Sequence, residues 1–359
     1  MRVVAWPAYT NKDVNPYNYL LYSGLVEFGV EVYELSKNMN CFLNYDIVHV
    51  HWPENLPNED RWLISSSKIS IFSSFLTIQK RRGAKIVWTV HNLQAHDRKQ
   101  GSRNVWFQNW LDRWFIPRID GVISLTHSGL ELALDRYPAL RSKAFEVIPH
   151  GHYINSYPNN ATREEAREII GISNDSKVVL FIGNVRPYKN VAQLIDSFIE
   201  MEDQDVNLII AGNPTNEDLK IIINNGASND SRIHPYLCFV EKEMMQYFLN
   251  ASDLVVLPYQ DILNSGSAIL ALSFFRPVLV PRKGSMSELQ SQFGVECVKT
   301  YDGELEADTL RAALTSVIDN PVDPHILEKR VRQNLDWSIV AGRTYDFYKA
   351  LLSKSQGDR

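Results

Sequence analysis

The sequence DLVVLPYQDILNSGSAILALSFFRPVLVP, residues 253–281, holds two short apolar runs on either side of a longer one. Residues 253–257 end at Pro258 and residues 278–280 follow Pro277, so both runs have the length and boundaries of buried parallel strands. Residues 267–275 are long enough for a helix, which ends at Arg276-Pro277 because proline cannot continue it. The stretch predicts a strand–loop–helix–strand unit of a parallel sheet.

The loop inside this unit ends in Asn264, Ser265, Gly266 and Ser267, where the helix should begin. Asparagine and serine side chains cap the first N–H groups of a helix, and glycine adds backbone freedom. The remaining first-turn N–H groups point out of the helix end and attract an anion, commonly a phosphate. Taken alone, the loop is explained equally well as an ordinary helix cap.

The rest of the chain alternates strand-like and helix-like segments in two rounds, which predicts two parallel sheets covered on both faces. Strands are expected at 3–6, 31–35, 47–50, 85–90, 121–125 and 145–148, and again at 178–182, 207–211, 253–257, 278–280 and 297–299. A polar, turn-rich segment at 152–162 separates the rounds. We expect an α/β protein with two doubly wound domains, 1–152 and 163–336, facing across a cleft, and a last helix within 337–359.

Composition narrows the class of protein. The 359 residues include 45% hydrophobic and 22% charged residues and carry a net charge of −5, which is ordinary for a globular protein. Residues 1–150 contain 17 Lys and Arg against 14 Asp and Glu, an excess too small for nucleic-acid binding but suited to weak attraction to an anionic membrane surface. Three separated cysteines, no apolar run of membrane-spanning length and no signal peptide predict a cytoplasmic protein.

A second loop combines glycine with two cations. The strand at 178–182 runs into Gly183, and Arg186 and Lys189 follow before the next helix. Glycine lets a ligand approach the backbone, and two cations at a sheet edge suit a diphosphate. Solvated loop charges are the simpler reading of this stretch by itself, but the loop at 258–267 leaves the same sheet at the same edge. The sequence therefore predicts one anion site built by both loops.

Four stretches resemble GT-B glycosyltransferases related to family 4: IPHG (148–151), IGNVRPYKNVAQLIDSF (182–198), CFVEKEMMQYFLNASDLVVLPY (238–259) and, with less specificity, VHNLQAHD (90–97). The resemblance implies two facing Rossmann-like domains, with a C-terminal helix that crosses back to the first. It also implies that the C-terminal domain binds a UDP- or GDP-linked sugar and needs neither metal nor other cofactor. The residues implied in donor binding are Gly183, Arg186, Lys189, Tyr259, Asn264, Ser265, Gly266 and Ser267.

The chain departs from the family 4 pattern in two places. The usual pair of glutamates falls on Ile262 and Leu270, and the usual arginine five residues before the lysine falls on Asn184. The form Ser265-Gly266-Ser267 followed by ALSFFRPV is instead similar to a bacterial exopolysaccharide subgroup that includes β-mannosyltransferases. The stereochemical outcome, the donor base, the sugar and the acceptor all stay open at the level of sequence.

An inverting transferase needs a base for the acceptor hydroxyl, and the N-terminal domain offers candidates after its buried strands. Asp97 is our first choice, with His91 and His96 next, because they follow the strand at 85–90. His51 and Glu54 follow the strand at 47–50 and are expected to line the cleft, with Glu54 as a second acid or base. Any single histidine is as well explained by a backbone contact at a strand end.

Other motifs predict less. His49 and His51 share a strand face but have no companion ligand at a metal spacing, so no metal site is expected. Asp203-Gln204-Asp205 has the D-x-D form but lies in a charged turn, and no G-x-G-x-x-G or P-loop is present. The aromatic helix at 104–118 and the basic run at 80–85 fit either core packing, which we favour, or contact with a membrane interface.

The predicted function is transfer of a sugar from a nucleotide-sugar to a hydroxyl of a lipid-linked or polysaccharide acceptor, in cell-surface glycan or exopolysaccharide synthesis. The protein would be a metal-independent hexosyltransferase, cytoplasmic or peripheral on the inner face of the membrane. The first alternative is a non-hydrolysing nucleotide-sugar epimerase, which has the same two-domain architecture. The second is a non-catalytic protein of the GT-B fold that binds nucleotides or glycans.

Overall fold

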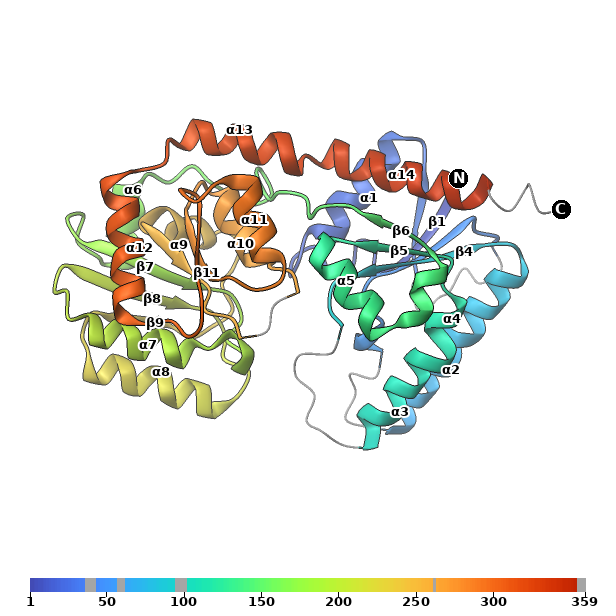
Figure 1. Ribbon diagram of the computed structural model, residues 1–359, viewed down its shortest axis with the longest axis horizontal. Helices are drawn as coiled ribbons and strands as arrows, with labels where there is room; N and C mark the ends of the chain where they lie inside the picture. Colours follow the sequence, from blue (N-terminus) through green and yellow to red (C-terminus); the bar gives the residue numbers. More distant parts are fainter. Residues whose placement is uncertain (36–42, 57–61, 94–101, 261–262, 354–359) are drawn as a thin grey trace. The chain divides into compact units, whose positions relative to one another are not determined.

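The computed structural model describes residues 1–35, 43–56, 62–93, 102–260 and 263–353. It divides the chain into two compact units (Figure 1). The N-terminal unit comprises Met1–Gly151 with Leu335–Arg359, and the C-terminal unit comprises His152–Asn334. The ranges expected from sequence were 1–152, 163–336 and 337–359. The structure thus places the turn-rich segment at 152–162 with the C-terminal unit.

The N-terminal unit is built on a six-stranded parallel sheet in the order β2-β1-β3-β4-β5-β6. The strands are β1 (Arg2–Trp6), β2 (Glu31–Glu34), β3 (Ile47–Val50), β4 (Lys85–Val90), β5 (Gly121–Ser124) and β6 (Ala144–Val147). Because β1 pairs with both β2 and β3, the strand order reverses at β1. Loops that follow β1 and β3 therefore leave the sheet at its topological switch point, where open α/β sheets bind ligands.

Helices and 3₁₀ turns connect these strands. They are α1 (Tyr17–Glu27), η1 (Pro53–Asn55), α2 (Trp62–Arg81), α3 (Ser102–Trp110), α4 (Ile116–Arg118), α5 (His127–Arg136) and η3 (Pro138–Ser142). The expected helix at 104–117 is interrupted, since residues Leu111–Phe115 (η2) form a π-helical turn between α3 and α4. Phe107, Leu111 and Phe115 are buried, as core packing requires. Trp106, Trp110 and Trp114 are only half-buried.

The C-terminal unit repeats the design with the strand order β12-β11-β10-β7-β8-β9, again all parallel. Its strands are β7 (Lys177–Ile182), β8 (Val206–Ala211), β9 (Ile233–Tyr236), β10 (Leu254–Val256), β11 (Val278–Pro281) and β12 (Val298–Tyr301). The switch point lies between β7 and β10. The loops at 183–190 and 257–265 follow these two strands, so the fold brings them to one place.

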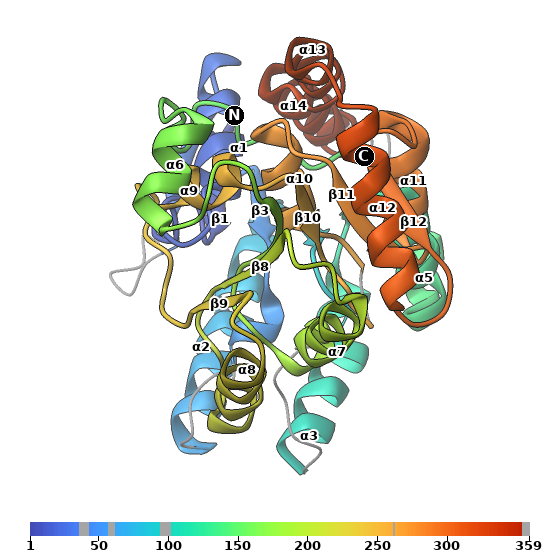
Figure 2. The same ribbon diagram turned by 90° about the vertical axis from the view of Figure 1, so that its left-hand side faces the viewer.

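Two layers of helices cover this second sheet (Figure 2). The helices are α6 (Arg163–Ile170), η4 (Pro187–Lys189), α7 (Val191–Met201), α8 (Glu217–Asn229), α9 (Met245–Ala251), α10 (Gly266–Ser273), α11 (Ser285–Phe293), α12 (Ala307–Asp319) and α13 (Pro324–Leu335). Helix α7 packs against α8 and α12, whereas α6 packs against α9. The core between the layers is formed by the buried strands, with Val179, Leu180 and Phe181 of β7 completely enclosed.

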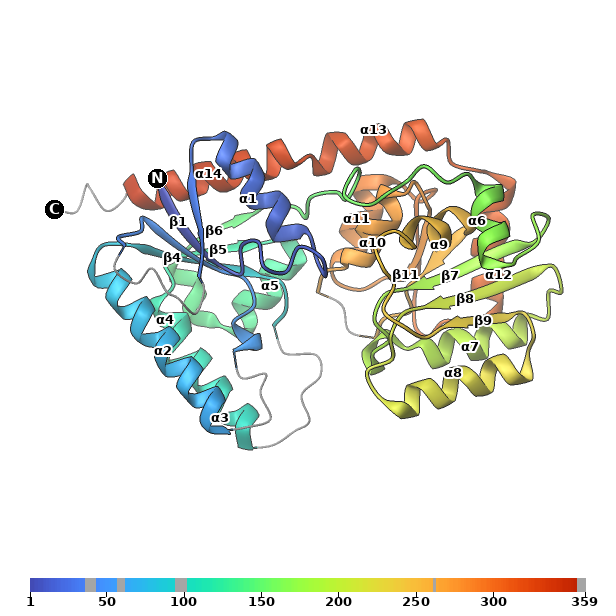
Figure 3. The same cartoon turned by 180° about the vertical axis from the view of Figure 1, so that it is seen from behind.

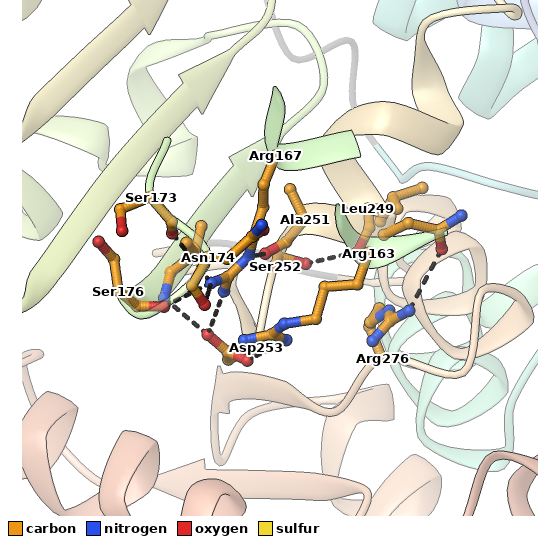
Figure 4. Close-up of polar contacts among 12 residues, drawn as sticks. Arg163, Arg167, Ser173, Asn174, Ser176, Leu249, Ala251, Ser252, Asp253 and Arg276 are labelled. Carbon is orange, nitrogen blue, oxygen red and sulfur yellow. Dashed lines mark hydrogen bonds and ion pairs between the residues drawn. The ribbon is translucent and has the colours of Figure 1, made fainter. Parts of the chain in front are cut away.

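A buried ionic cluster fixes the start of β10 (Figure 4). Asp253 accepts hydrogen bonds from Arg163 at 2.5 Å, from Arg167 at 3.1 Å and from the Val178 N–H at 2.8 Å. Arg167 is fully buried and also donates to the carbonyl oxygens of Ala251, Ser173, Asn174 and Ser176. The cluster therefore ties α6 and the end of α9 to the central strands β7 and β10.

The C-terminal helix α14 (Trp337–Ser353) belongs to the N-terminal unit and packs against α1 (Figure 1). Val340, Ala341, Tyr348 and Leu351 are part of that unit's core. The contact is close, because a Cβ added to Gly24 of α1 would lie 2.9 Å from the Cβ of Ala341. Among the helices in the described ranges, none is both long and apolar enough to cross a membrane.

Candidate active site

Lys189, Gly183 and Ser267 meet at the switch point of the C-terminal sheet. A Cβ placed on Gly183 would lie 3.1 Å from Nζ of Lys189 and 3.2 Å from Oγ of Ser267, so both polar atoms lie against the glycine backbone. Gly183 has a φ of +116°, which L-residues with a side chain rarely adopt. Three of the predicted anion-site residues, drawn from both loops, thus lie close together.

The Lys189 side chain is buried, with 8% of its surface exposed. Its ammonium lies 5.2 Å from the ring centroid of Tyr259 and 5.8 Å from that of Phe181. Burial lowers the pKa of Lys189 to about 8, and the charge of nearby Arg186 acts in the same direction. A buried cation with low solvation binds an incoming anion strongly, since little water must be removed from it.

The helix end has the predicted cap. Ser265 is the N-cap of α10, and its hydroxyl accepts a hydrogen bond from the Ala268 N–H at 3.1 Å. The first backbone bond of this helix end runs from Ile269 N–H to the Ser265 carbonyl. Gly266 and Ser267 are the first two residues of the helix, so their N–H groups point out of the helix tip, and Asn264 lies just before the cap. Such a tip favours a bound phosphate.

Tyr259 joins the two loops. Burial raises the pKa of the Tyr259 hydroxyl to about 12, while the nearby hydroxyls of Ser267 and Ser265 oppose the shift. Its ring also lies edge-on to Tyr188, and the Gln260 N–H donates to the Tyr188 carbonyl at 2.8 Å. The loop after β7 and the loop after β10 are therefore held together by backbone and side-chain contacts before any ligand is bound.

Gly212, which follows β8, sets the course of the β7 loop, a role that the sequence pattern did not indicate. A Cβ added to Gly212 would overlap the carbonyl of Gly183. Beyond this point Val185 donates to Asn213 and accepts from Thr215, which continues the strand pairing into the loop. The loop is thereby directed over β8 and back to α7, with Lys189 turned toward Gly183.

At the carboxyl edge of the N-terminal sheet, His91 follows β4, and Glu54 lies in η1 after the switch-point strand β3. His91 is buried, stacks on Trp52 with 4.3 Å between ring centroids, and is hydrogen bonded through Nε2 to Nδ1 of His51 at 3.0 Å. Glu54 is 7% exposed, and its Oε1 accepts from Nδ2 of Asn92 at 3.1 Å. Asp97 and His96 lie outside the described residues.

The remaining candidates are bonded to other side chains of the protein. Asp203 and Asp205 pair with Arg311 and Lys177, both at 2.9 Å, so the D-x-D sequence serves as a charged turn. His49 and His51 are completely buried and hydrogen bonded to tyrosine hydroxyls. Within the ranges that the structure describes, no three His, Cys, Asp or Glu side chains gather as metal ligands.

Two doubly wound parallel sheets in two units, with a C-terminal helix that returns to the first unit, are the architecture of GT-B glycosyltransferases. The solved structures agree with the fold: sucrose-phosphate synthase from Thermosynechococcus elongatus has a TM-score of 0.69 at 14% identity and covers 99% of this chain and 100% of that one. Anabaena HepE in complex with UDP and glucose has a TM-score of 0.66 at 14% identity, covering 98% and 100%.

The chain belongs to the glycosyl transferases group 1 family. The family model matches residues 162–334. The chain is also 30% identical to GDP-mannose:glycolipid 4-beta-D-mannosyltransferase of Xanthomonas campestris pv. campestris over 96% of its own length and 90% of that protein. The predictions of a GT-B fold and of a glycosyltransferase are confirmed, as is the likeness to the mannosyltransferase subgroup.

Proposed function

We propose that the protein transfers mannose from GDP-mannose to a hydroxyl of a lipid-linked glycan. The observation that supports this most is the 30% identity, over nearly the whole of both chains, to an enzyme named for that donor and a glycolipid acceptor. The convergence of Lys189, Gly183 and Ser267 at the switch point supplies a place for the donor diphosphate.

In this proposal the C-terminal unit stabilises the departing GDP. Lys189 and Arg186 provide positive charge, and the N–H groups of Gly266 and Ser267 provide donors at the helix tip. As the bond between the sugar carbon and the diphosphate oxygen breaks, negative charge grows on that oxygen. Fixed donors in a buried site stabilise such charge without reorganisation, which is why the proposed reaction runs without a metal ion.

The N-terminal unit would activate the acceptor. A base removes the proton of the acceptor hydroxyl as its oxygen bonds to the sugar carbon. Asp97 remains the base that the sequence favours, and Glu54 is a buried carboxylate at the same sheet edge. GDP-mannose has its sugar in α linkage, so a β product would require inversion in a single displacement.

A lipid-linked acceptor places the reaction near a membrane surface, and exposed residues of α2 form a face that fits one. Figure 3 shows the course of α2 in the N-terminal unit. Ile64, Ile71 and Ile78 are 37%, 55% and 40% exposed at seven-residue spacing, so they form one stripe. Helix α2 contains no acidic residue and ends in Lys80 and Arg81, and Arg82 follows directly after the helix. We propose that this stripe contacts a bilayer rich in anionic lipid.

Ligand binding and transfer together test the proposal. Isothermal titration with GDP, GDP-mannose, UDP and UDP-glucose should show binding of the guanosine ligands. Radiolabelled GDP-mannose should then label a lipid-linked glycan extract only when protein is present. Binding of UDP-glucose in preference to GDP-mannose would overturn the donor assignment. Conversion of the free donor to another nucleotide-sugar would identify an epimerase, and binding without turnover across acceptors would identify a non-catalytic protein.

A further inference from the structure

A continuous chain of hydrogen-bonded side chains runs through the core of the N-terminal unit. Thr89 Oγ1 is 2.7 Å from Nε2 of His49, whose Nδ1 lies 2.9 Å from the hydroxyl of Tyr22. The same Tyr22 hydroxyl is 2.6 Å from Nε2 of His51. Nδ1 of His51 is in turn 3.0 Å from Nε2 of His91. All members are buried, so no water competes for these bonds.

One additional residue joins this chain from the other end of the sequence. Tyr348, on α14, places its hydroxyl 2.6 Å from Nδ1 of His49, where Tyr22 also makes contact. Nδ1 of a neutral imidazole has either one hydrogen or one lone pair. Two hydroxyls therefore share a single acceptor or a single donor, and this restricts the direction in which every other hydrogen bond of the chain points.

In two arrangements of the hydrogens, the Tyr22 hydroxyl donates to one of its two imidazole partners. In the first, Tyr22 donates to Nε2 of His51, so His51 donates from Nδ1 to Nε2 of His91. His49 then either accepts from Tyr348 or donates to Tyr22. In the second, Tyr22 donates to Nδ1 of His49 and accepts from His51. The lone pair of His49 Nδ1 is then already used by Tyr22. The Tyr348 hydroxyl, 2.6 Å from that nitrogen, would find no lone pair there to accept its hydrogen. A third arrangement, in which Tyr22 accepts from both imidazoles, leaves its buried hydrogen without an imidazole acceptor and is disfavoured.

We propose that Tyr348 fixes the polarity of this relay, so that His91 accepts at Nε2 and has its hydrogen on Nδ1. In that tautomer Nδ1 of His91 is a hydrogen-bond donor and Nε2 already accepts from His51, so the ring has no lone pair with which to act as a general base. Tyr348, Tyr22, His51 and His49 are then positioning residues for His91. The relay sets the tautomer whatever the acceptor is, but its value to catalysis rests on the proposed transferase function.

The surroundings keep the relay uncharged. Burial lowers the pKa of His49 to about 3 and the pKa of His51 and His91 well below its usual value. Among the residues that the structure describes, two further titratable side chains near His91 are Tyr17, 5.0 Å away between ring centroids, and His150, which itself lies 4.8 Å from Tyr17. Burial raises the pKa of Tyr17 and lowers that of His150 to about 4, so both are also neutral near pH 7.

Histidine tautomers can be read directly from the full-length protein. Two-bond ¹H–¹⁵N correlation spectra of ¹⁵N-histidine-labelled protein separate Nδ1–H from Nε2–H rings, and loss of one spin system in His91→Gln assigns that residue. Wild type should show His91 as the Nδ1–H form. Tyr348→Phe removes the obstacle to the second arrangement, so it should move His91 wholly or partly to the Nε2–H form. Tyr345→Phe, the same change on the half-buried face of α14, should leave the spectrum as it is.

A second variant covers the case in which Tyr348→Phe fails to fold. Tyr22→Phe removes the donor to His51 and should shift the nitrogen signals of both His51 and His91. Circular dichroism melting establishes that each variant is folded. The proposal is overturned by an Nε2–H His91 in wild type, or by an unchanged His91 in a folded Tyr348→Phe or Tyr22→Phe protein. These spectra need neither donor nor acceptor, so they are independent of the mannosyltransferase assignment.

Discussion

The Gly183 carbonyl occupies the space in which Gly212 would otherwise hold a Cβ atom. The two glycines end the adjacent strands β7 and β8, and their contact lets the loop with Arg186 and Lys189 pass over the edge of the sheet. The contact is between backbone atoms, so a flexible side chain cannot move aside to relieve a collision. The position of the proposed diphosphate site therefore depends on a residue that need not touch the ligand.

Gly212→Ala should weaken GDP-mannose binding at least about tenfold, because the added methyl must displace Gly183 and with it the Lys189 loop. Isothermal titration measures the loss. Gly303→Ala is the matched control, since a Cβ at Gly303 meets nothing within 4 Å. That variant should lower stability through its φ of +77° yet bind donor normally. Equal affinity in the two variants would show that the glycine contact does not shape the site.

The donor affinity should fall as the pH rises through 8. Lys189 has a pKa of about 8, so its charge is nearly complete at pH 7 and largely lost at pH 9. Binding of a diphosphate to the charged form then predicts a dissociation constant about tenfold higher at pH 9 than at pH 7. Lys189→Arg keeps its charge over this range and should flatten the profile. A wild-type profile as flat as that of the arginine variant would contradict the role of Lys189.

The same lysine should cost the unliganded protein stability. Burial holds the pKa of Lys189 at about 8 in the folded state, below the value of 10.5 in the unfolded chain. The charged ammonium at pH 7 therefore destabilises the folded state relative to the unfolded state. Lys189→Met should raise the free energy of unfolding by up to about 3 kcal/mol at pH 7, and this gain should shrink as the pH rises from 8 toward 10.5. Urea unfolding at pH 7 and pH 10 measures the difference. A destabilised methionine variant at pH 7 would show that the ammonium has stabilising contacts.

The donor loops were predictable from sequence because each one follows an apolar strand, and parallel strands end at the same sheet edge. Gly183, Lys189 and the Ser265 cap could be placed for that reason. The role of Gly212 could not, since it depends on how closely two neighbouring backbones approach. The tyrosine–histidine relay could not be predicted from the sequence either, because Tyr348 and His49 are 299 residues apart in the chain and meet only in the folded structure.

The aromatic helix shows a different limit of sequence reasoning. Its spacing suggested one buried stripe, but the π-helical turn at Leu111–Phe115 changes the periodicity within the segment. Trp110 and Trp114 stack at 5.7 Å between ring centroids, and Arg118 lies 4.4 Å from the ring of Trp114. Trp110 stacks on the buried Phe107 and Phe115, and both Trp110 and Trp114 remain partly exposed, which a regular helical periodicity does not predict.

Asp253→Asn should destabilise the C-terminal unit by about 3–5 kcal/mol, because it leaves the buried Arg167 without its carboxylate while Arg163 and Arg276 remain nearby. Urea denaturation should show a lower midpoint with an unchanged slope. Asp302→Asn removes a carboxylate whose partner, Arg282, is 48% exposed, so it should barely change the midpoint. Equal midpoints for the two variants would mean that the buried cluster contributes little.

The α2 stripe can be tested with vesicles that contain phosphatidylglycerol. Ile71→Asp places a negative charge in the middle of the stripe and should reduce cosedimentation with these vesicles several-fold, with a smaller effect on neutral vesicles. Ile221→Asp is the control, because Ile221 lies on α8 of the C-terminal unit and is 50% exposed. Retention of wild-type vesicle binding by Ile71→Asp, or loss of it in both variants, would exclude α2 as the membrane contact.

Glu54→Gln distinguishes between Glu54 and Asp97, the two carboxylates proposed as the base that activates the acceptor. If Glu54 is the base, the variant should lose kcat by about 100-fold or more, since the amide cannot take a proton, while GDP-mannose affinity stays normal. The amide keeps an acceptor oxygen for Asn92, so the local fold should survive. Asp97→Asn, measured in parallel, gives the complementary result if that residue is the base.

Because Tyr348 is inferred to hold His91 as a hydrogen-bond donor, His91→Gln should slow transfer less than the loss of the true base. A His91→Gln variant slower than both carboxylate variants would instead make the imidazole the proton acceptor.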